Sequence, residues 1–379
     1  MTEKQSYITA FNESLQAIWE KSEFKEATVI QEKTASLLLE GKDVIAESPT
    51  GTGKTIAYLL PLLHKLNSEK KSAQIVILAP SRELVMQIHQ EVQKWSEGSG
   101  VSSASFIGGA NVKRQVEKLK KSPQVIVGTP GRIYELIKIK KLKMHEVKTI
   151  VLDEGDQLLV PEHTKTIQDI IKTTLNERQV VLFSATTNDS TESKARDLMK
   201  NPAFITVKRD EIQSGIVEHM YLVCEQRDKL ETLERIAKTI PMKALAFVKD
   251  IGLLNVVAEK LEFKGLEFGL LHGESTKAER EASIRDFRSG KITLLLATDL
   301  AARGLDIEGL ELVIHYDLAL NESQYIHRSG RTGRLGASGT ILSIVTDREA
   351  RELKKIAKEL EIELKKKVLY KAQLMDERK

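Results

Sequence analysis

The chain alternates short runs rich in β-branched residues with longer segments of helical periodicity, and it does so in two successive series. The first series of runs is KDVIAES, AQIVILAPS, PQVIVGTP, KTIVLDE and QVVLFSAT. The second series is EHMYLVCE, KALAFVK, LEFGLLHG, ITLLLATD, LELVIHYD and GTILSIVT. Strands that alternate with helices form parallel sheets with helices on both faces. The sequence therefore predicts an α/β protein built from two similar units.

The length supports the same division, because 379 residues exceed one ordinary core and suit two domains. We place the first domain at residues 1–207, a polar linker at 208–215 and the second domain at 216–379. We interpret residues 354–371 as a basic C-terminal helix, for which a solvated surface is the simplest explanation.

The composition, 41% hydrophobic and 30% charged, is typical of a folded protein. No apolar run is long enough to span a bilayer, and the first residues lack the design of a signal peptide, so we expect a cytoplasmic protein that makes no membrane contact. The single cysteine, Cys224, cannot form an internal disulfide or hold a structural metal by itself, and we expect neither. A net charge of +4 permits nucleic acid as a partner without requiring it.

Residues 48–55, SPTGTGKT, follow one predicted strand and open a predicted helix, as a phosphate-binding loop does. Glycines let the backbone turn its N–H groups inward, Lys54 brings charge to the outer phosphates, and the Thr55 hydroxyl suits Mg²⁺. Serine replaces the first glycine of the usual pattern. The predicted nucleotide contacts are Ser48, Pro49, Thr50, Gly51, Thr52, Gly53, Lys54 and Thr55.

Two adjacent acids, Asp153 and Glu154, directly follow the apolar run Thr149-Ile-Val-Leu. Such acids repel each other unless a cation lies beside them. We therefore expect Mg²⁺ to be held by Thr55, phosphate oxygens and Asp153, with Glu154 orienting the attacking water. A surface acidic turn is the alternative, and the phosphate loop disfavours it.

The string HRSGRTGR at residues 327–334 places three arginines between glycines in the second unit. Phosphate hydrolysis needs positive charge where the transition state develops negative charge. If the two units close on each other, Arg331 and Arg334 can act as arginine fingers on the γ-phosphate. Each unit then supplies half of the hydrolytic site.

With these three elements in this order, the chain resembles the DEAD-box RNA helicases from about Phe11 to near Thr346. The family's DEAD motif is written DEGD here, with Gly155 in place of alanine and with both catalytic acids and Asp156 retained. The resemblance implies two tandem RecA-like domains, ATP and Mg²⁺ as cofactors, and RNA as the partner.

The resemblance also implies the remaining site assignments. Phe24, Thr28 and Gln31 match the motif that binds adenine, with ordinary core packing as the alternative for Phe24. Further nucleotide contacts are expected from Gly304 and Asp306. The expected RNA contacts are Arg82, Gly109, Thr129, Arg132, Gly273, Arg280 and Thr298. The residues expected to couple hydrolysis to RNA are Asp156, Ser184, Thr186, His327 and Arg328. Ser329 and Lys277 replace the usual isoleucine and glutamine.

The implied function is that of an enzyme, an ATP-dependent RNA helicase that binds RNA without sequence preference and opens short duplexes. Short bacterial members of this kind act in ribosome assembly and cold adaptation, which makes ribosomal RNA or pre-ribosomal particles the expected partners. The alternative is an ATP-gated RNA clamp that separates no strands. A DNA translocase is disfavoured by the adenine-motif residues and by the SAT and HRSGRTGR strings, and a small kinase or GTPase by the second domain.

Overall fold

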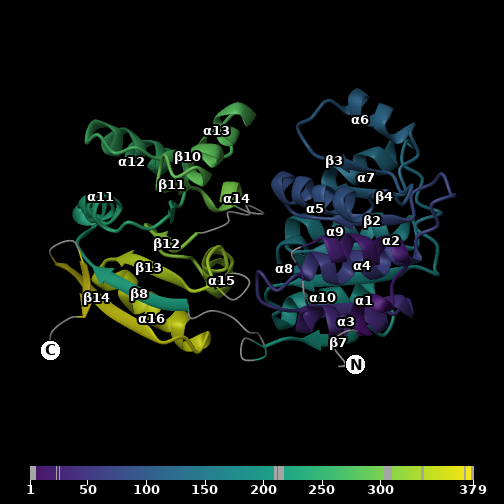
Figure 1. Cartoon of the computed structure of the whole chain (residues 1–379), viewed down its shortest axis with the longest axis horizontal. Helices are drawn as coiled ribbons and strands as arrows, with labels where there is room; N and C mark the ends of the chain where they lie inside the picture. The colour runs from purple at the N-terminus through teal and green to yellow at the C-terminus, as the bar shows by residue number, and fades with distance from the viewer. Residues whose placement is uncertain are drawn as a thin grey trace. The chain divides into compact units, whose positions relative to one another are not determined.

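The computed structural model describes residues 6–22, 24, 26–208, 211, 217–302, 310–333, 337–370 and 373–376. Residue contacts divide the chain into two compact units, residues 1–212 and 213–379, and each unit holds one sheet (Figure 1). The predicted α/β class is confirmed. The predicted linker, residues 208–215, lies largely outside the described residues, and the domain bounds stay a prediction. Within the described ranges, no helix combines the length and the apolar character that a membrane crossing requires.

The first unit contains a parallel sheet whose strands lie in the order β3-β4-β2-β5-β6-β1-β7. Its strands are β1 (Val44–Glu47), β2 (Ile75–Leu78), β3 (Ser103–Phe106), β4 (Val125–Gly128), β5 (Thr149–Asp153), β6 (Gln179–Ser184) and β7 (Ala203–Thr206). Because all the strands run in one direction, their carboxyl ends share one edge of the sheet. The segments that follow β5, β6 and β1 are therefore neighbours there, and those that follow β3, β4 and β2 occupy the other half.

Helices cover both faces of this sheet, and successive residues of each strand serve opposite cores. In β1, Val44 and Ala46 belong to one core and Ile45 to the other. The first core also takes residues from α1 (Ser6–Thr9), α2 (Glu13–Lys21), α3 (Val29–Leu39), α4 (Lys54–Lys65) and α5 (Arg82–Trp95). The second takes residues from α6 (Val112–Leu119), α7 (Pro130–Lys138), α8 (Gly155–Leu158), α9 (Pro161–Lys172) and α10 (Asp189–Leu198).

The second unit repeats the design with the strand order β10-β11-β9-β12-β13-β8-β14-β15. Its strands are β8 (Val217–Val223), β9 (Ala244–Phe247), β10 (Gly269–Leu271), β11 (Leu294–Ala297), β12 (Leu312–His315), β13 (Gly339–Val345), β14 (Leu364–Tyr370) and β15 (Gln373–Asp376). One face packs against α11 (Lys229–Thr239), which follows the 3₁₀ turn η3 (Gln226–Asp228), and α12 (Ile251–Phe263). The other face packs against α13 (Lys277–Arg288), α14 (Asp299–Ala302), α15 (Glu322–Ser329) and α16 (Asp347–Glu359).

The predicted C-terminal helix over residues 354–371 is wrong in its second half. Helix α16 ends at Glu359, the left-handed backbone of Glu361 (φ 54°) turns the chain, and the lysine-rich stretch forms strand β14 instead. Lys365 pairs with Glu218 of β8 at 2.6 Å, and Lys367 pairs with Asp376 of β15 at 2.6 Å. The lysines thus have acidic partners on neighbouring strands, which a strand with alternating faces allows and which the sequence pattern did not reveal.

Candidate nucleotide and RNA sites

Residues 48–53 form a tight loop between β1 and α4, and Lys54 and Thr55 open the helix, in the strand-to-helix setting that the sequence predicts. Gly51 (φ 79°) and Gly53 (φ 83°) adopt left-handed backbone conformations, which glycine tolerates best. The Lys54 ammonium lies over the loop, where it donates to the carbonyls of Ser48 at 2.6 Å and Pro49 at 2.8 Å. The loop therefore holds its cation at the helix N-terminus, where backbone N–H groups and a positive charge together suit phosphate.

Gln31 connects the predicted adenine motif to this loop. Its amide accepts a hydrogen bond from the Thr28 N–H at 3.0 Å and donates to the Gly53 carbonyl at 3.3 Å. A Cβ at Gly53 would lie 2.6 Å from the Gln31 amide nitrogen, so the close approach requires glycine. The motif and the phosphate loop are thus one packed assembly in the first unit.

Phe24, predicted to pack on adenine, belongs to an aromatic cluster. Its ring stacks on Trp19 with centroids 5.7 Å apart and lies 6.1 Å from the Trp95 ring. The core-packing alternative therefore has direct support for one part of the ring, which is half-buried. Contact with adenine stays a prediction.

Asp153 and Glu154 occupy the end of β5 as predicted. Burial raises the pKa of the Asp153 carboxyl to about 6, and the Glu154 charge adds to the rise, while a hydrogen bond from Tyr58 and the Lys54 charge oppose it. Glu154 has a left-handed backbone (φ 54°), and its Oε2 atom is buried without a hydrogen bond from the described residues. Hard oxygen donors beside a phosphate loop fit Mg²⁺, which commonly takes one or two protein carboxylates and completes its shell with phosphate and water.

Within the described residues, no group of three or more His, Cys, Asp or Glu side chains is arranged to hold a metal ion. Magnesium binding by Thr55 and Asp153 stays a prediction.

The predicted coupling residues of the first unit are in direct contact. The Ser184 hydroxyl donates to Asp156 Oδ1 at 2.7 Å, and the Thr186 hydroxyl donates to Asp156 Oδ2 at 3.2 Å. Since Asp156 follows the two acids of β5 and Ser184 ends β6, the bonds tie neighbouring strand ends together. A movement of the Asp153–Glu154 segment would therefore be transmitted to the segment after β6 through these hydrogen bonds.

The predicted RNA residues of the first unit also converge. A Cβ at Gly109 would collide with the Arg82 guanidinium, so that glycine makes room for the arginine. Arg132 is only 7% exposed, donates to the Ala110 carbonyl at 3.0 Å and pairs with Glu135 at 3.0 Å. Its guanidinium thereby holds the loop after β3, and its contact with RNA stays a prediction. Thr129 caps α7 at the adjacent strand end.

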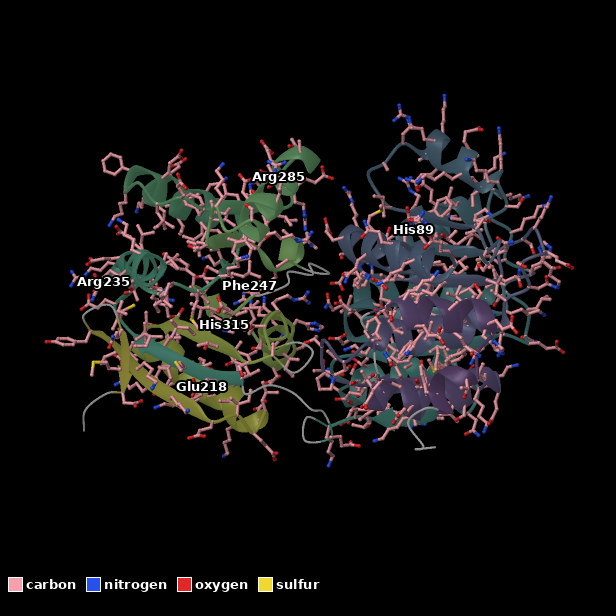
Figure 2. The ribbon with its side chains drawn as sticks, in the orientation of Figure 1. His89, Glu218, Arg235, Phe247, Arg285 and His315 are labelled. Carbon is pink, nitrogen blue, oxygen red and sulfur yellow. The ribbon has the colours of Figure 1, made fainter. Side chains whose placement is uncertain are left out.

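In the second unit, Arg328 is buried in a network that the sequence did not reveal. It forms a bidentate pair with Asp299, both bonds at 2.7 Å, and donates to the Asp317 carbonyl at 2.6 Å. Its guanidinium lies 5.0 Å from the centre of the Phe247 ring. Phe247 of β9 is in register with His315 of the neighbouring strand β12, and Figure 2 labels both residues. Asp299 follows Thr298 within the string ATDLAARGLD, so its position was visible in the sequence although its role was not.

The other predicted residues of the second unit are only partly described. Arg331 is 8% exposed and donates to the His327 carbonyl at 3.1 Å. Arg280 donates to the Ala301 carbonyl, Thr298 is buried after β11, and a Cβ at Gly273 would meet open space. The predicted residues Gly304, Asp306 and Arg334 lie outside the described residues, as does the Lys277 side chain.

The sequence did not predict one further residue of the site, Tyr58. The Tyr58 hydroxyl donates to Asp153 Oδ2 at 2.8 Å from the first turns of α4. A tyrosine four residues after Lys54 on an apolar helix looks like core, and no sequence signal distinguishes its hydroxyl.

Comparisons with known proteins agree with this geometry. A family model described as DEAD/DEAH box helicase matches residues 28–194, and one described as helicase conserved C-terminal domain matches residues 228–336. The chain is 55% identical over 368 residues to the probable ATP-dependent RNA helicase YfmL of Bacillus subtilis, covering 97% of this chain and 98% of that protein. It is 55% identical over 362 residues to the DEAD-box ATP-dependent RNA helicase CshC of Bacillus cereus, covering 96% and 93%.

Solved structures show the same similarity. S. cerevisiae Dbp5 bound to RNA and ADP BeF3 aligns with a TM-score of 0.87 at 30% identity, covering 96% of this chain and 95% of that one. Mss116p bound to ssRNA and AMP-PNP aligns with a TM-score of 0.84 at 27% identity, covering 94% and 78%. These similarities confirm the predicted fold of two tandem RecA-like domains.

Proposed function

This chain belongs to the DEAD-box family of ATP-dependent RNA helicases, which are RNA-dependent ATPases, and we propose that it uses ATP to grip single-stranded RNA and open short RNA duplexes. The observation that carries the proposal is the order of strand ends in the first unit. Nucleotide motifs follow β1 and β5, the coupling motif lies at the end of β6, and RNA motifs follow β2, β3 and β4, on the same edge of one sheet.

The nucleotide is held by the loop of residues 48–55, with adenine against Phe24, Thr28 and Gln31. Mg²⁺, when bound at Thr55 and Asp153, neutralises phosphate charge. Lys54 binds the outer phosphate oxygens, and Glu154 orients the attacking water. The buried and unpaired Oε2 of Glu154 supports this role, because a carboxylate oxygen in that position can accept a proton from water.

Arginines of the second unit complete the site in our proposal. Arg331 and Arg334 neutralise the charge that develops on the γ-phosphate, an effect worth about 10³ to 10⁵ in rate in other phosphate-transfer enzymes. ATP and RNA then both favour the state in which the two units meet, and by linkage each raises the affinity for the other. The Arg328 pair with Asp299 holds helix α15 to the segment after β11. Because Arg331 lies just after α15, this pair supports the proposed placement of the arginines.

RNA binds through its sugar-phosphate chain in this scheme, at Arg82, Gly109, Thr129, Arg132, Gly273, Arg280 and Thr298. Contacts of this kind give little sequence preference, and contacts to 2′-hydroxyls separate RNA from DNA. The hydrogen bonds of Asp156 with Ser184 and Thr186 support a path by which ATP hydrolysis beside Asp153 and Glu154 changes the binding of RNA.

The test measures ATP hydrolysis and strand displacement together. RNA should stimulate ATP turnover far more than DNA of the same sequence, and ATP should displace one strand of an RNA duplex of about ten base pairs. Glu154→Gln should trap a form bound to ATP and RNA that releases RNA slowly, whereas Glu177→Gln, at an exposed acid of the same unit, should behave as wild type. Equal stimulation by DNA, or fast RNA release from Glu154→Gln, would contradict the proposal.

A clamp that separates no strands is the second candidate, favoured if ATP slows RNA release while the ten-base-pair duplex stays intact. We further propose a cytoplasmic role in ribosome assembly or cold adaptation, for which a cross-linking map of RNAs bound in cells is the test. Ribosomal RNA should dominate that map, and its absence from the cross-linked RNAs would refute the role.

A further inference from the structure

The hydroxyl of Tyr58 contacts Asp153, one of the two side chains proposed to bind magnesium. It donates to Asp153 Oδ2 at 2.8 Å, and it comes from the same helix, α4, whose first turn carries Thr55, the other one. Tyr58 is fully buried and Asp153 nearly so. The two residues therefore form a buried hydrogen-bonded pair beside the phosphate loop.

The carboxylate of Asp153 is fixed at both of its oxygens. Oδ2 accepts from Tyr58, and Oδ1 accepts from the Glu154 N–H at 2.9 Å. A carboxylate has about four lone-pair positions, so roughly two remain for a metal ion or its water ligands. The side chain is thus oriented before any cation arrives, which is what outer partners do for metal ligands.

We propose that Tyr58 is a positioning residue of the magnesium site, where its hydroxyl orients the Asp153 carboxylate. The inference rests on the proposed use of Asp153 and Thr55 for Mg²⁺. It adds a residue outside the signature motifs whose hydroxyl sets how strongly the site binds the ion.

The ring and the hydroxyl of Tyr58 can be separated by experiment. The ring packs against Phe183 with centroids 5.4 Å apart, and Tyr58→Phe keeps that contact while it removes only the hydroxyl. The chain offers a matched control in the same unit. Tyr134 also donates to a carboxylate, Asp169 Oδ2 at 3.1 Å, and Tyr134→Phe removes an equivalent bond away from the phosphate loop.

The experiment titrates Mg²⁺ against the binding of a fluorescent ADP analogue without RNA, for the whole chain and both variants. Loss of a partner that orients a metal ligand typically weakens metal binding about 10-fold or more. Tyr58→Phe should raise the Mg²⁺ concentration for half-saturation by about that factor, and Tyr134→Phe should leave it within about twofold. ADP binding in excess EDTA should be equal in all three proteins, which shows that the variants remain folded.

An unchanged Mg²⁺ requirement in Tyr58→Phe would overturn the inference, and so would an equal change in both variants. If ADP binding by the wild-type protein does not respond to Mg²⁺, the proposed magnesium site is refuted, and the proposed role of Tyr58 is refuted with it. Stimulation of ATP turnover by RNA is measured separately, so failure of the proposed function is distinguishable from failure of the role of Tyr58.

Discussion

Gly155 is the first residue of α8, at the position where the family motif has alanine. A Cβ built on Gly155 would lie 2.5 Å from Leu182 Cγ and 2.7 Å from both of its Cδ atoms. Leu182 is fully buried in β6, two residues before Ser184. Gly155→Ala, which restores the alanine of the family motif, is therefore expected to destabilise this protein.

Two opposing effects set the magnitude. Replacing glycine with alanine where the backbone tolerates a side chain gains about 0.4–1 kcal/mol, mainly by restricting the unfolded chain. Gly155 is not among the described residues with positive φ, so backbone strain does not cancel that gain. Forcing a methyl group into a packed core costs about 1–3 kcal/mol. Overpacking wins, and the expected net loss is about 0.5–2 kcal/mol.

Urea unfolding monitored by tryptophan fluorescence reports on the first unit, which contains Gly155. Trp19 and Trp95 are the only two tryptophans, and both lie in that unit. Gly131→Ala is the matched control, since Gly131 lies in the first turn of α7 and an added Cβ there meets no atom within 4 Å. It should be neutral or slightly stabilising.

A double-mutant cycle identifies the atoms responsible. Leu182→Ala removes all three colliding atoms and alone should cost about 2–5 kcal/mol through the cavity that it leaves. Combined with Gly155→Ala, the total should be less than the sum by at least about 1 kcal/mol, because the new methyl group partly fills that cavity. Additive costs, or a Gly155→Ala protein as stable as wild type, would refute the reasoning.

Three further predictions concern the second unit. Burial lowers the pKa of His315 well below its ordinary value, so the folded unit keeps the ring neutral while the unfolded chain takes up a proton below about pH 6.5. Thermal melts by circular dichroism should show stability lost as pH falls below 6.5, by up to about 1.4 kcal/mol per pH unit, and His315→Asn should reduce that slope; an unchanged slope would contradict this. Ser329→Ala should stabilise the unit by about 1 kcal/mol, because the buried hydroxyl has no hydrogen-bond partner among the described residues; a loss would show that it has one. Glu349→Ala should cost about 3–5 kcal/mol, since it leaves the fully buried Lys229 without its 2.7 Å partner; a neutral result would show that water reaches the ammonium.

The sequence predicted most strands well because the central ones, such as β2, β4 and β5, are buried on both faces, although the predicted β10 lies at a sheet edge. Such strands are short runs of apolar, often β-branched residues, which the eleven quoted runs share, and the structure has a strand within every one of them. The unusual residues at strand ends could also be predicted, since parallel strands collect them at one edge.

The strands that the sequence did not predict lie toward sheet edges. β3 (SASF) and β7 (AFIT) have weaker patterns, and β7 buries neither face fully. β14 is rich in lysine and forms a strand by pairing with β8 and β15, whose acids Glu218 and Asp376 pair with two of its lysines. Their formation depends on tertiary partners, which local propensity does not contain.

The same limit applies to the candidate sites, where the motifs indicate which groups we propose to face the ligands but not the residues that orient those groups. Asp153 is oriented by Tyr58, which sequence periodicity assigns to the core, and Arg328 is oriented by Asp299, whose carboxylate accepts from two of its nitrogens. In each pair a charged group is buried, and burial is tolerable only where its hydrogen bonds are satisfied. Replacing Tyr58 would leave Asp153 with the Glu154 N–H alone of its two hydrogen-bond donors, and replacing Asp299 would leave Arg328 without its ion-pair partner. The proposed sites therefore depend on side chains that carry no chemistry themselves.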